Sequence, residues 1–236
     1  MINPLAVADE VAFPDANQLI TEDDTPVDNF ASAKQQRLLV SSLYSSWQTE
    51  PFLAEANVGI YHTVNQPAIV PDVFVSLDVQ VPKDWWEKPN RCYLVWNFGK
   101  SPEIVLEIVS NRVGNELTDK LQTYAHMRAS YYIVYDPAQH LGDTELYLYE
   151  LRGHRYVELS ETWLEPVNLG LTRWQGSFEG RQDTWLRWCD AQGNILLTGD
   201  EKAGQEHQRA EQERQRADRL AELLKAQGID PDQSSL

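Results

Sequence analysis

The sequence has few of the residues that build disulfide frameworks or zinc sites. Its two cysteines, Cys92 and Cys189, lie far apart and form no CxxC pair, and its five histidines show no HxxxH or HExxH spacing. A zinc site needs closely spaced ligands, and a disulfide framework needs several cysteines. The sequence therefore argues against both, and we expect the cysteines to be free thiols in a reducing cytoplasm.

Long hydrophobic runs are also missing. No stretch of about 18 apolar residues occurs, so the sequence predicts no membrane-spanning helix. The first residues show no basic region followed by an apolar core, so no secretory signal is expected. We therefore expect a cytoplasmic protein.

Positive charge is scarce. The chain carries 20 Lys and Arg against 36 Asp and Glu, a net charge of −16, which argues against a protein that coats nucleic acid non-specifically. The 33 residues before Lys34 contain seven acids and no Lys or Arg. Any contact with DNA must use a local basic set: Lys83, Lys88, Arg91, Lys100, Arg112, Lys120 and Arg128.

The segment from Pro102 to Pro137 predicts a strand, a helix and a second strand. Residues 103–109 form an apolar run rich in β-branched residues, 115–128 carry a helical apolar stripe, and 131–134 are again strand-like. A unit of this length favours a right-handed crossover between parallel strands.

Glu107 lies in the middle of the first of these strands. Strand alternation puts it between Val105 and Val109 on a face that is expected to be buried. An isolated charge there would cost several kcal/mol, so Glu107 must be paired, protonated or bound to a cation. A structural ion pair with Lys120 is one open alternative.

Two further features accompany Glu107. Glu116, Lys120 and Tyr124 follow one another at steps of four and should line one helix face. Upstream, Asp72 stands at the entry of a predicted strand over 69–75, where it could also merely cap a turn.

This ordered set resembles the restriction-endonuclease-like PD-(D/E)XK nucleases and, more closely, the Uma2 family (DUF820). The similarity covers roughly residues 30–175. The matching stretches are Pro71–Val75 (PDVFV), Pro102–Ser110 (PEIVLEIVS), Glu116, Lys120, Tyr124 and Tyr132–Pro137 (YIVYDP). One position departs from the wider signature: Val109 stands where the basic residue is expected, and the resemblance to Uma2 moves that role to Lys120.

The resemblance implies a metal-dependent endonuclease that hydrolyses phosphodiester bonds, with DNA as the expected partner. Its catalytic residues would be Asp72, Glu107 and Lys120, supported by Glu116 and Tyr124. Asp72, Glu107 and the backbone carbonyl of Ile108 would bind Mg²⁺, and Mn²⁺ would substitute for it. Glu116 would position Lys120 or hold a second ion through water.

The expected fold class is α/β (α+β), with a restriction-endonuclease-like core. It consists of a mixed central sheet flanked by helices, a β-hairpin extension over 145–159 and a long C-terminal helix. We divide the chain into an acidic flexible arm (1–30), a nuclease-like domain (31–197) and a charged helix (198–236). A first helix over 32–47, with Ser32 as N-cap, offers Gln35 and Gln36 where such nucleases often supply an acid.

Three alternatives stay open. The tail, where alanines recur every seven residues from Ala203, is a solvated helix, a homodimer-forming coiled coil or a nucleic-acid arm. The aromatic segment 82–100 is a packed surface lobe or a base-stacking platform. The whole chain could also be an inactive nuclease-fold scaffold that acts through its C-terminal helix, or a hydrolase of another phosphate ester.

Overall fold

The computed structural model describes residues 29–49, 51–63, 67–87, 90–111 and 115–227. The predicted acidic arm therefore lies, except for its last two residues, outside the described part. The division into three parts stays a prediction. No helix within the described ranges is long and apolar enough to cross a membrane.

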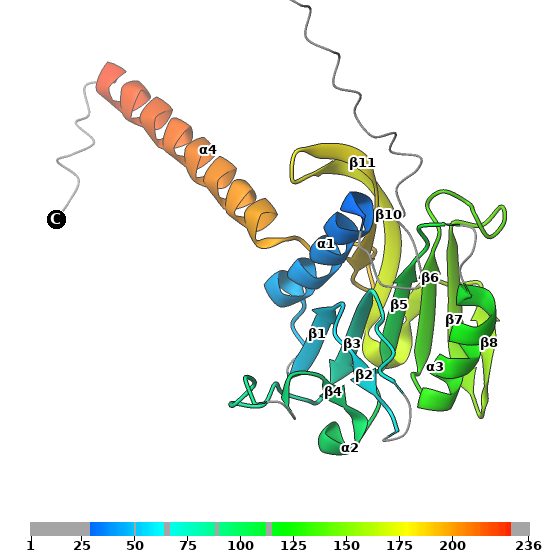
Figure 1. Cartoon of the computed structure of the whole chain (residues 1–236). Helices are drawn as coiled ribbons and strands as arrows, with labels where there is room; N and C mark the ends of the chain where they lie inside the picture. Colours follow the sequence, from blue (N-terminus) through cyan, green and yellow to red (C-terminus); the bar gives the residue numbers. More distant parts are fainter. Residues whose placement is uncertain (1–28, 50, 64–66, 88–89, 112–114, 228–236) are drawn as a thin grey trace, which may run out of the picture.

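A six-stranded mixed sheet forms the centre of the molecule (Figure 1). Within it β5 and β6 are parallel, as predicted, and the other neighbouring strands are antiparallel. The hairpin extension is confirmed as β7–β8. In spatial order the strands are β1 (Phe52–Ala56), β3 (Val73–Leu77), β5 (Ile104–Ile108), β6 (Tyr131–Tyr135), β7 (Leu146–Arg152) and β8 (Arg155–Leu159).

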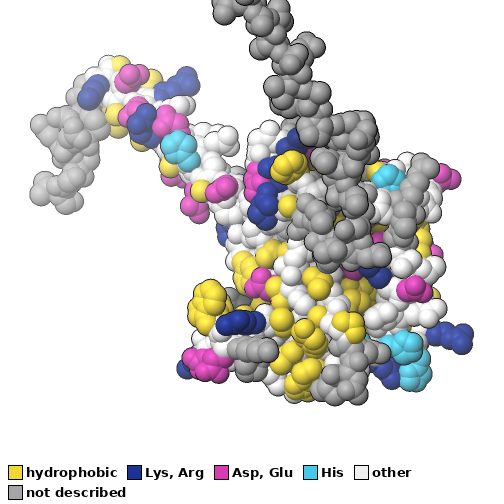
Figure 2. Space-filling view, viewed as in Figure 1, with side chains coloured by type: hydrophobic (Ala, Val, Ile, Leu, Met, Phe, Trp, Pro, Cys, Tyr) yellow, Lys and Arg dark blue, Asp and Glu magenta, His cyan; other side chains and the backbone are white. Residues whose placement is uncertain are grey.

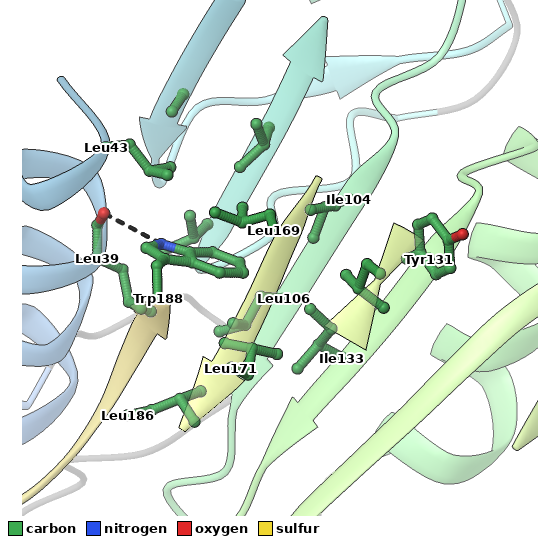
Figure 3. Packing of buried hydrophobic residues seen from close by; sticks show 14 of the residues in the cluster. Leu39, Leu43, Ile104, Leu106, Tyr131, Ile133, Leu169, Leu171, Leu186 and Trp188 are labelled. Atoms are coloured by element: carbon green, nitrogen blue, oxygen red, sulfur yellow. Dashed lines mark hydrogen bonds between the residues drawn. The ribbon is translucent and has the colours of Figure 1, made fainter. Parts of the chain in front are cut away.

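One face of this sheet packs against helix α1 (Phe30–Ser46) and a second, three-stranded sheet. The second sheet consists of β9 (Trp163–Leu164), β10 (Leu169–Phe178) and β11 (Arg181–Cys189), with a short helix η4 (Glu165–Val167) between β9 and β10. Leu39, Leu106 and Trp188 are fully buried between these layers, and the Trp188 indole donates a hydrogen bond to the Leu39 carbonyl at 3.1 Å (Figure 3).

The other face of the sheet is covered by helix α3 (Leu121–Met127) and a smaller lobe. Val105, Tyr124 and Tyr132 are buried there. The lobe contains β2 (Ile60–Tyr61), β4 (Tyr93–Leu94) and α2 (Val95–Phe98), with β2 and β4 parallel. The central strand β5 therefore has both faces buried, as its continuous apolar sequence predicts. The mixed sheet, flanking helices and long C-terminal helix confirm the predicted fold class.

Two helix starts differ from prediction. The N-cap of α1 is Asn29, whose side chain accepts a hydrogen bond from the Ser32 amide at 2.9 Å, and Ser32 is itself buried in the first turn. Asn and Ser are equally good caps, and the helix uses the earlier one. The helix predicted over 115–128 begins with a π-helical turn, η3 (Glu116–Lys120), before α3.

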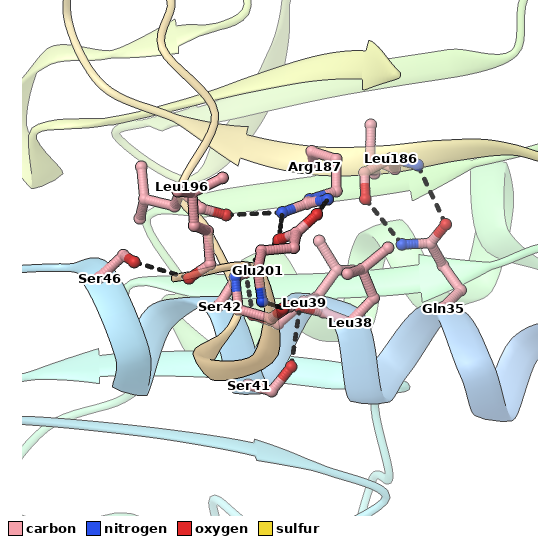
Figure 4. A network of polar contacts seen from close by, with 12 residues as sticks. Gln35, Leu38, Leu39, Ser41, Ser42, Ser46, Leu186, Arg187, Leu196 and Glu201 are labelled. Atoms are coloured by element: carbon pink, nitrogen blue, oxygen red, sulfur yellow. Dashed lines mark hydrogen bonds and ion pairs between the residues drawn. The ribbon is translucent and has the colours of Figure 1, made fainter. Parts of the chain in front are cut away.

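The C-terminal helix α4 (Gly199–Ala226) extends away from the domain (Figure 1). Thr198 and Glu201 form a capping box at its start. Arg187, only 1% exposed, donates from Nη1 and Nη2 to the Glu201 carboxylate at 2.9 and 2.7 Å and from Nη2 to the Leu196 carbonyl at 2.8 Å (Figure 4). The first turn of α4 is thus fixed to β11.

Candidate active site

The strand register brings the two predicted carboxylates to one place on the sheet. Val73 on β3 pairs with Leu106 on β5 in antiparallel register, so one further step sets Asp72 opposite Glu107. Residues directly opposite each other on antiparallel strands point to the same face. Asp72 and Glu107 therefore lie on the face that also carries α3.

Glu107 is 3% exposed and both of its carboxylate oxygens are hydrogen-bonded. The Tyr124 hydroxyl donates to Oε1 at 2.5 Å, and the Lys120 ammonium donates to Oε2 at 3.0 Å. Burial raises the pKa of Glu107 to about 7, with a smaller contribution from the nearby Asp72 charge, although Lys120 and Tyr124 oppose the rise. Keeping the Glu107 carboxylate ionised in this buried position therefore costs free energy.

Lys120 reaches Glu107 from the solvent boundary. Its side chain is 37% exposed, against 4% for that of Glu107. Burial lowers the pKa of Lys120, but the Glu107 carboxylate outweighs this effect and the pKa is raised above its ordinary value. Lys120 is consequently a charged ammonium at neutral pH.

The π-helical turn sets Glu116 and Lys120 side by side. The Lys120 amide donates to the Asn115 carbonyl five residues earlier at 3.0 Å, and the Tyr132 hydroxyl fixes the Glu116 carbonyl at 3.0 Å. The Lys120 ammonium lies 3.5 Å from Glu116 Oε1. Such turns frequently mark functional sites. Here the turn gives one ammonium two carboxylate neighbours.

Asp72 is held from two sides. Its Oδ2 accepts from the Ile108 amide at 2.6 Å, and its Oδ1 accepts from the Gln36 side-chain amide at 2.7 Å. Asn57 in turn donates to Gln36 at 3.0 Å. Helix α1 therefore reaches the site through a neutral amide, Gln36, a role that the sequence left undecided.

The Ile108 peptide is adjacent to Asp72, as its amide contact shows. In an extended strand the N–H and C=O of one residue point to the same side. The Ile108 carbonyl is thus directed toward the same side of β5 as Asp72. The structure places all the predicted site residues within one neighbourhood.

The oxygen donors are of the type that a hard cation prefers. Within the described ranges no three or more His, Cys, Asp or Glu side chains form a metal-binding group. Mg²⁺ needs no such cage, since it is usually held by one or two carboxylates with water and substrate oxygens. Glu116 Oε2 is buried and has no hydrogen-bond partner in the described part of the chain. The donor set fits a partly hydrated divalent cation.

Comparisons with known proteins identify a family. A family model named Uma2 and described as "putative restriction endonuclease" matches residues 17–174. Neither the curated proteins nor the solved structures contain a match to this chain.

Proposed function

Because the chain belongs to the Uma2 family, whose model carries the description "putative restriction endonuclease", we propose that it is a divalent-metal-dependent nuclease that hydrolyses phosphodiester bonds of DNA. The observation that carries this proposal is the buried Glu107 carboxylate, held between Tyr124 and Lys120 and facing Asp72. The family model supports a nuclease; the metal and the DNA substrate are our inference.

Asp72, Glu107 and the Ile108 carbonyl would hold Mg²⁺ or Mn²⁺. The bound cation would polarise the phosphodiester and acidify an attacking water. The pKa of Glu107, raised to about 7, supports this assignment, because a cation between the two carboxylates removes the repulsion that Asp72 adds to the cost of burial.

Lys120 would act as a cation and not as a base. Its raised pKa keeps the ammonium protonated at neutral pH, so it has no free lone pair to accept a proton. The ammonium would donate a hydrogen bond to the attacking water or the phosphoryl oxygen, and it would stabilise the negative charge that develops there. Glu116 and Tyr124 would fix the positions of Lys120 and Glu107.

Cleavage of plasmid and single-stranded DNA in Mg²⁺ or Mn²⁺ tests this function. We expect the wild type to cleave only with a divalent cation, and Glu107→Gln to lose roughly a hundredfold or more of the rate. Glu103→Gln is the matched control, because Glu103 immediately precedes β5 and pairs with another lysine, Lys100. Its rate should stay close to that of the wild type.

Failure of the wild type to cleave with any divalent cation would contradict the proposal, as would full activity of Glu107→Gln. The second candidate is then a nuclease-fold binding protein without turnover. It is supported by α4, which extends away from the domain and offers a long polar face to a partner.

A further inference from the structure

A cavity of about 570 Å³ opens in the lobe beside the candidate active site. Its walls are largely apolar and aromatic, and its size lies in the range of small-ligand pockets. The walls include Leu53, Phe74, Trp85, Trp86, Tyr93 and Phe98. Figure 2 shows hydrophobic side chains gathered on this lower part of the molecule, around β2, β4 and α2.

The register connects the cavity to the site. Glu55 on β1 lies opposite Phe74 on β3, and both line the cavity. Phe74 and Asp72 are two residues apart, so they point to the same face of the sheet, separated by roughly 7 Å along the strand. The cavity is therefore a neighbour of the Asp72–Glu107 pair on one surface.

The aromatic walls divide into a fixed floor and an open rim. Tyr93 is buried and stacks on Phe98 with the ring centroids 4.2 Å apart, and Phe74 packs edge-on against Tyr93 at 5.3 Å. Trp85 and Trp86 remain 54% and 80% exposed. The rim thus offers flat indole faces to solvent, a costly arrangement for a lobe whose only role is packing.

Glu55 supplies a polar group inside this apolar setting. No hydrogen bond or ion pair engages its carboxylate among the residues that the structure describes, and burial raises its pKa. Arg91, which also lines the cavity, is fixed by a hydrogen bond from its Nε to the Trp86 carbonyl at 2.8 Å. A ligand with a planar ring and an exocyclic amine would satisfy both the indole rim and the carboxylate.

We propose that this cavity binds one unstacked nucleobase of the strand whose phosphate lies at Asp72 and Glu107, with the base stacked on Trp86 and an exocyclic amine donating to Glu55. The pocket rests on the proposed function for its substrate class. It would favour cytosine over thymine at that position, because only cytosine carries the amine.

The test measures binding of fluorescent single-stranded DNA of about 12 nucleotides by anisotropy in EDTA, so that no turnover is needed. We expect Trp86→Ala to weaken binding roughly tenfold, as one lost base–aromatic stack predicts. Trp96→Ala is the matched control, since Trp96 is 49% exposed in the same lobe but does not line the cavity. It should bind within about twofold of the wild type.

Base preference gives a second, independent measurement. The wild type should bind an oligonucleotide of alternating dC and dT several-fold more tightly than oligo-dT, and Glu55→Gln should lose this preference while Trp86 still stacks. Cys92 adds a chemical probe, because it lines the cavity and the other cysteine, Cys189, is buried. The dC-containing strand should slow alkylation of Cys92.

The outcomes separate the two proposals. Equal weakening by Trp86→Ala and Trp96→Ala, or no DNA binding by the wild type, would overturn the pocket. A wild type that binds with the expected base preference and cleaves nothing would overturn the proposed function alone. A wild type that cleaves while Trp86→Ala binds normally would overturn the pocket alone.

Discussion

At the scale of single residues, two effects act in opposite directions on the pKa of Glu107: burial raises it, and the hydrogen bonds and charge of its partners lower it. Two donors, Tyr124 and Lys120, satisfy its oxygens, yet burial keeps its pKa near 7. A structural ion pair would be expected to lower the pKa of the carboxylate. The raised value is more typical of a functional group held ready for a cation or a proton.

Lys120→Ala separates a catalytic from a structural lysine. We expect cleavage to be abolished while Mg²⁺ binding is unchanged or slightly tighter, because a neighbouring positive charge repels the cation. A purely structural pair would instead leave a buried charge and cost about 3–5 kcal/mol of unfolding free energy. Cleavage assays and chemical denaturation of the same preparation distinguish these results, with Lys100→Ala as the control.

Glu107→Gln tests the cation itself. In the wild type, Mg²⁺ or Mn²⁺ should raise the melting temperature progressively with the logarithm of its concentration, since the ion binds the folded state. The glutamine keeps the shape and removes the charge, so this rise should disappear. The metal-free variant should melt no lower than the wild type at pH 8, because the cost of burying the charge is gone. A metal response that survives in Glu107→Gln would place the cation elsewhere.

Much of the site follows from sequence alone, and the reason is periodicity. Strand alternation puts Glu107 on a buried face, and steps of four align Glu116, Lys120 and Tyr124. Gln36 could not be assigned in this way. It is a neutral side chain on a helix, and its contact with Asp72 depends on how α1 packs across the sheet.

At the scale of elements, the first turn of α4 is anchored to the domain through Glu201. The few apolar residues after Leu197 predict a segment that is dispensable for folding, but Arg187 is buried and its carboxylate partner is Glu201. Removing Glu201 leaves a guanidinium uncompensated in the interior. The heptad pattern begins at Ala203, after the anchored turn, so it does not predict the contact between Glu201 and Arg187.

Two truncations test the anchor. A chain that ends after Leu197 should lose about 3–5 kcal/mol of unfolding free energy, whereas one that ends after Gln205 keeps Glu201 and should melt within a few degrees of the full chain. Thermal and urea denaturation measure both. Equal stability of the two truncated chains would show that the Arg187 pair contributes little.

The turn between β10 and β11 is tied to α1 by Glu179. Hydrogen bonds from Arg37 and Lys34 lower the pKa of Glu179 to about 2. A lowered carboxylate pKa stabilises the fold above about pH 4.5, and this contribution is lost as the pH falls toward 2. Because Glu179 is 37% exposed, solvent screening keeps the effect below about 1 kcal/mol.

Glu179→Gln should therefore lower the unfolding free energy slightly at pH 7 and leave it unchanged near pH 2. Urea denaturation across this pH range measures the difference. The variant Glu158→Gln on β8 is the control, with no expected change at either pH. A difference that persists at pH 2 would assign the effect to packing.

At the scale of the whole molecule, alternating strands and helices with their turns predicted a mixed sheet and its parallel β5–β6 pair. The second sheet was harder to predict, because β9 has only two residues and β10 contains two glycines, Gly170 and Gly176. Their packing against α1 joins residues about 150 positions apart, such as Leu39 and Trp188. Local patterns carry no information about such a distant contact.

The uneven distribution of charge along the chain should affect the rate at which DNA associates with it. The seven acids before Lys34 are Asp9, Glu10, Asp15, Glu22, Asp23, Asp24 and Asp28, and they precede α1, the helix that reaches Asp72 through Gln36. Changing all seven to Asn or Gln takes the net charge from −16 to −9 and should speed association at low salt.

The matched control changes six acids of α4 and spares Glu201: Asp200, Glu206, Glu211, Glu213, Asp218 and Glu222. Because α4 extends away from the domain, we expect these charges to be screened from DNA at the candidate site more strongly, since the screening length at physiological salt is only about 8 Å. Stopped-flow association with labelled DNA should show a large gain for the first variant and a small one for the control. Both gains should vanish near 1 M salt, where the screening length falls to about 3 Å. Equal increases in the association rate for the two variants would mean that the rate depends on net charge and not on where the charges lie.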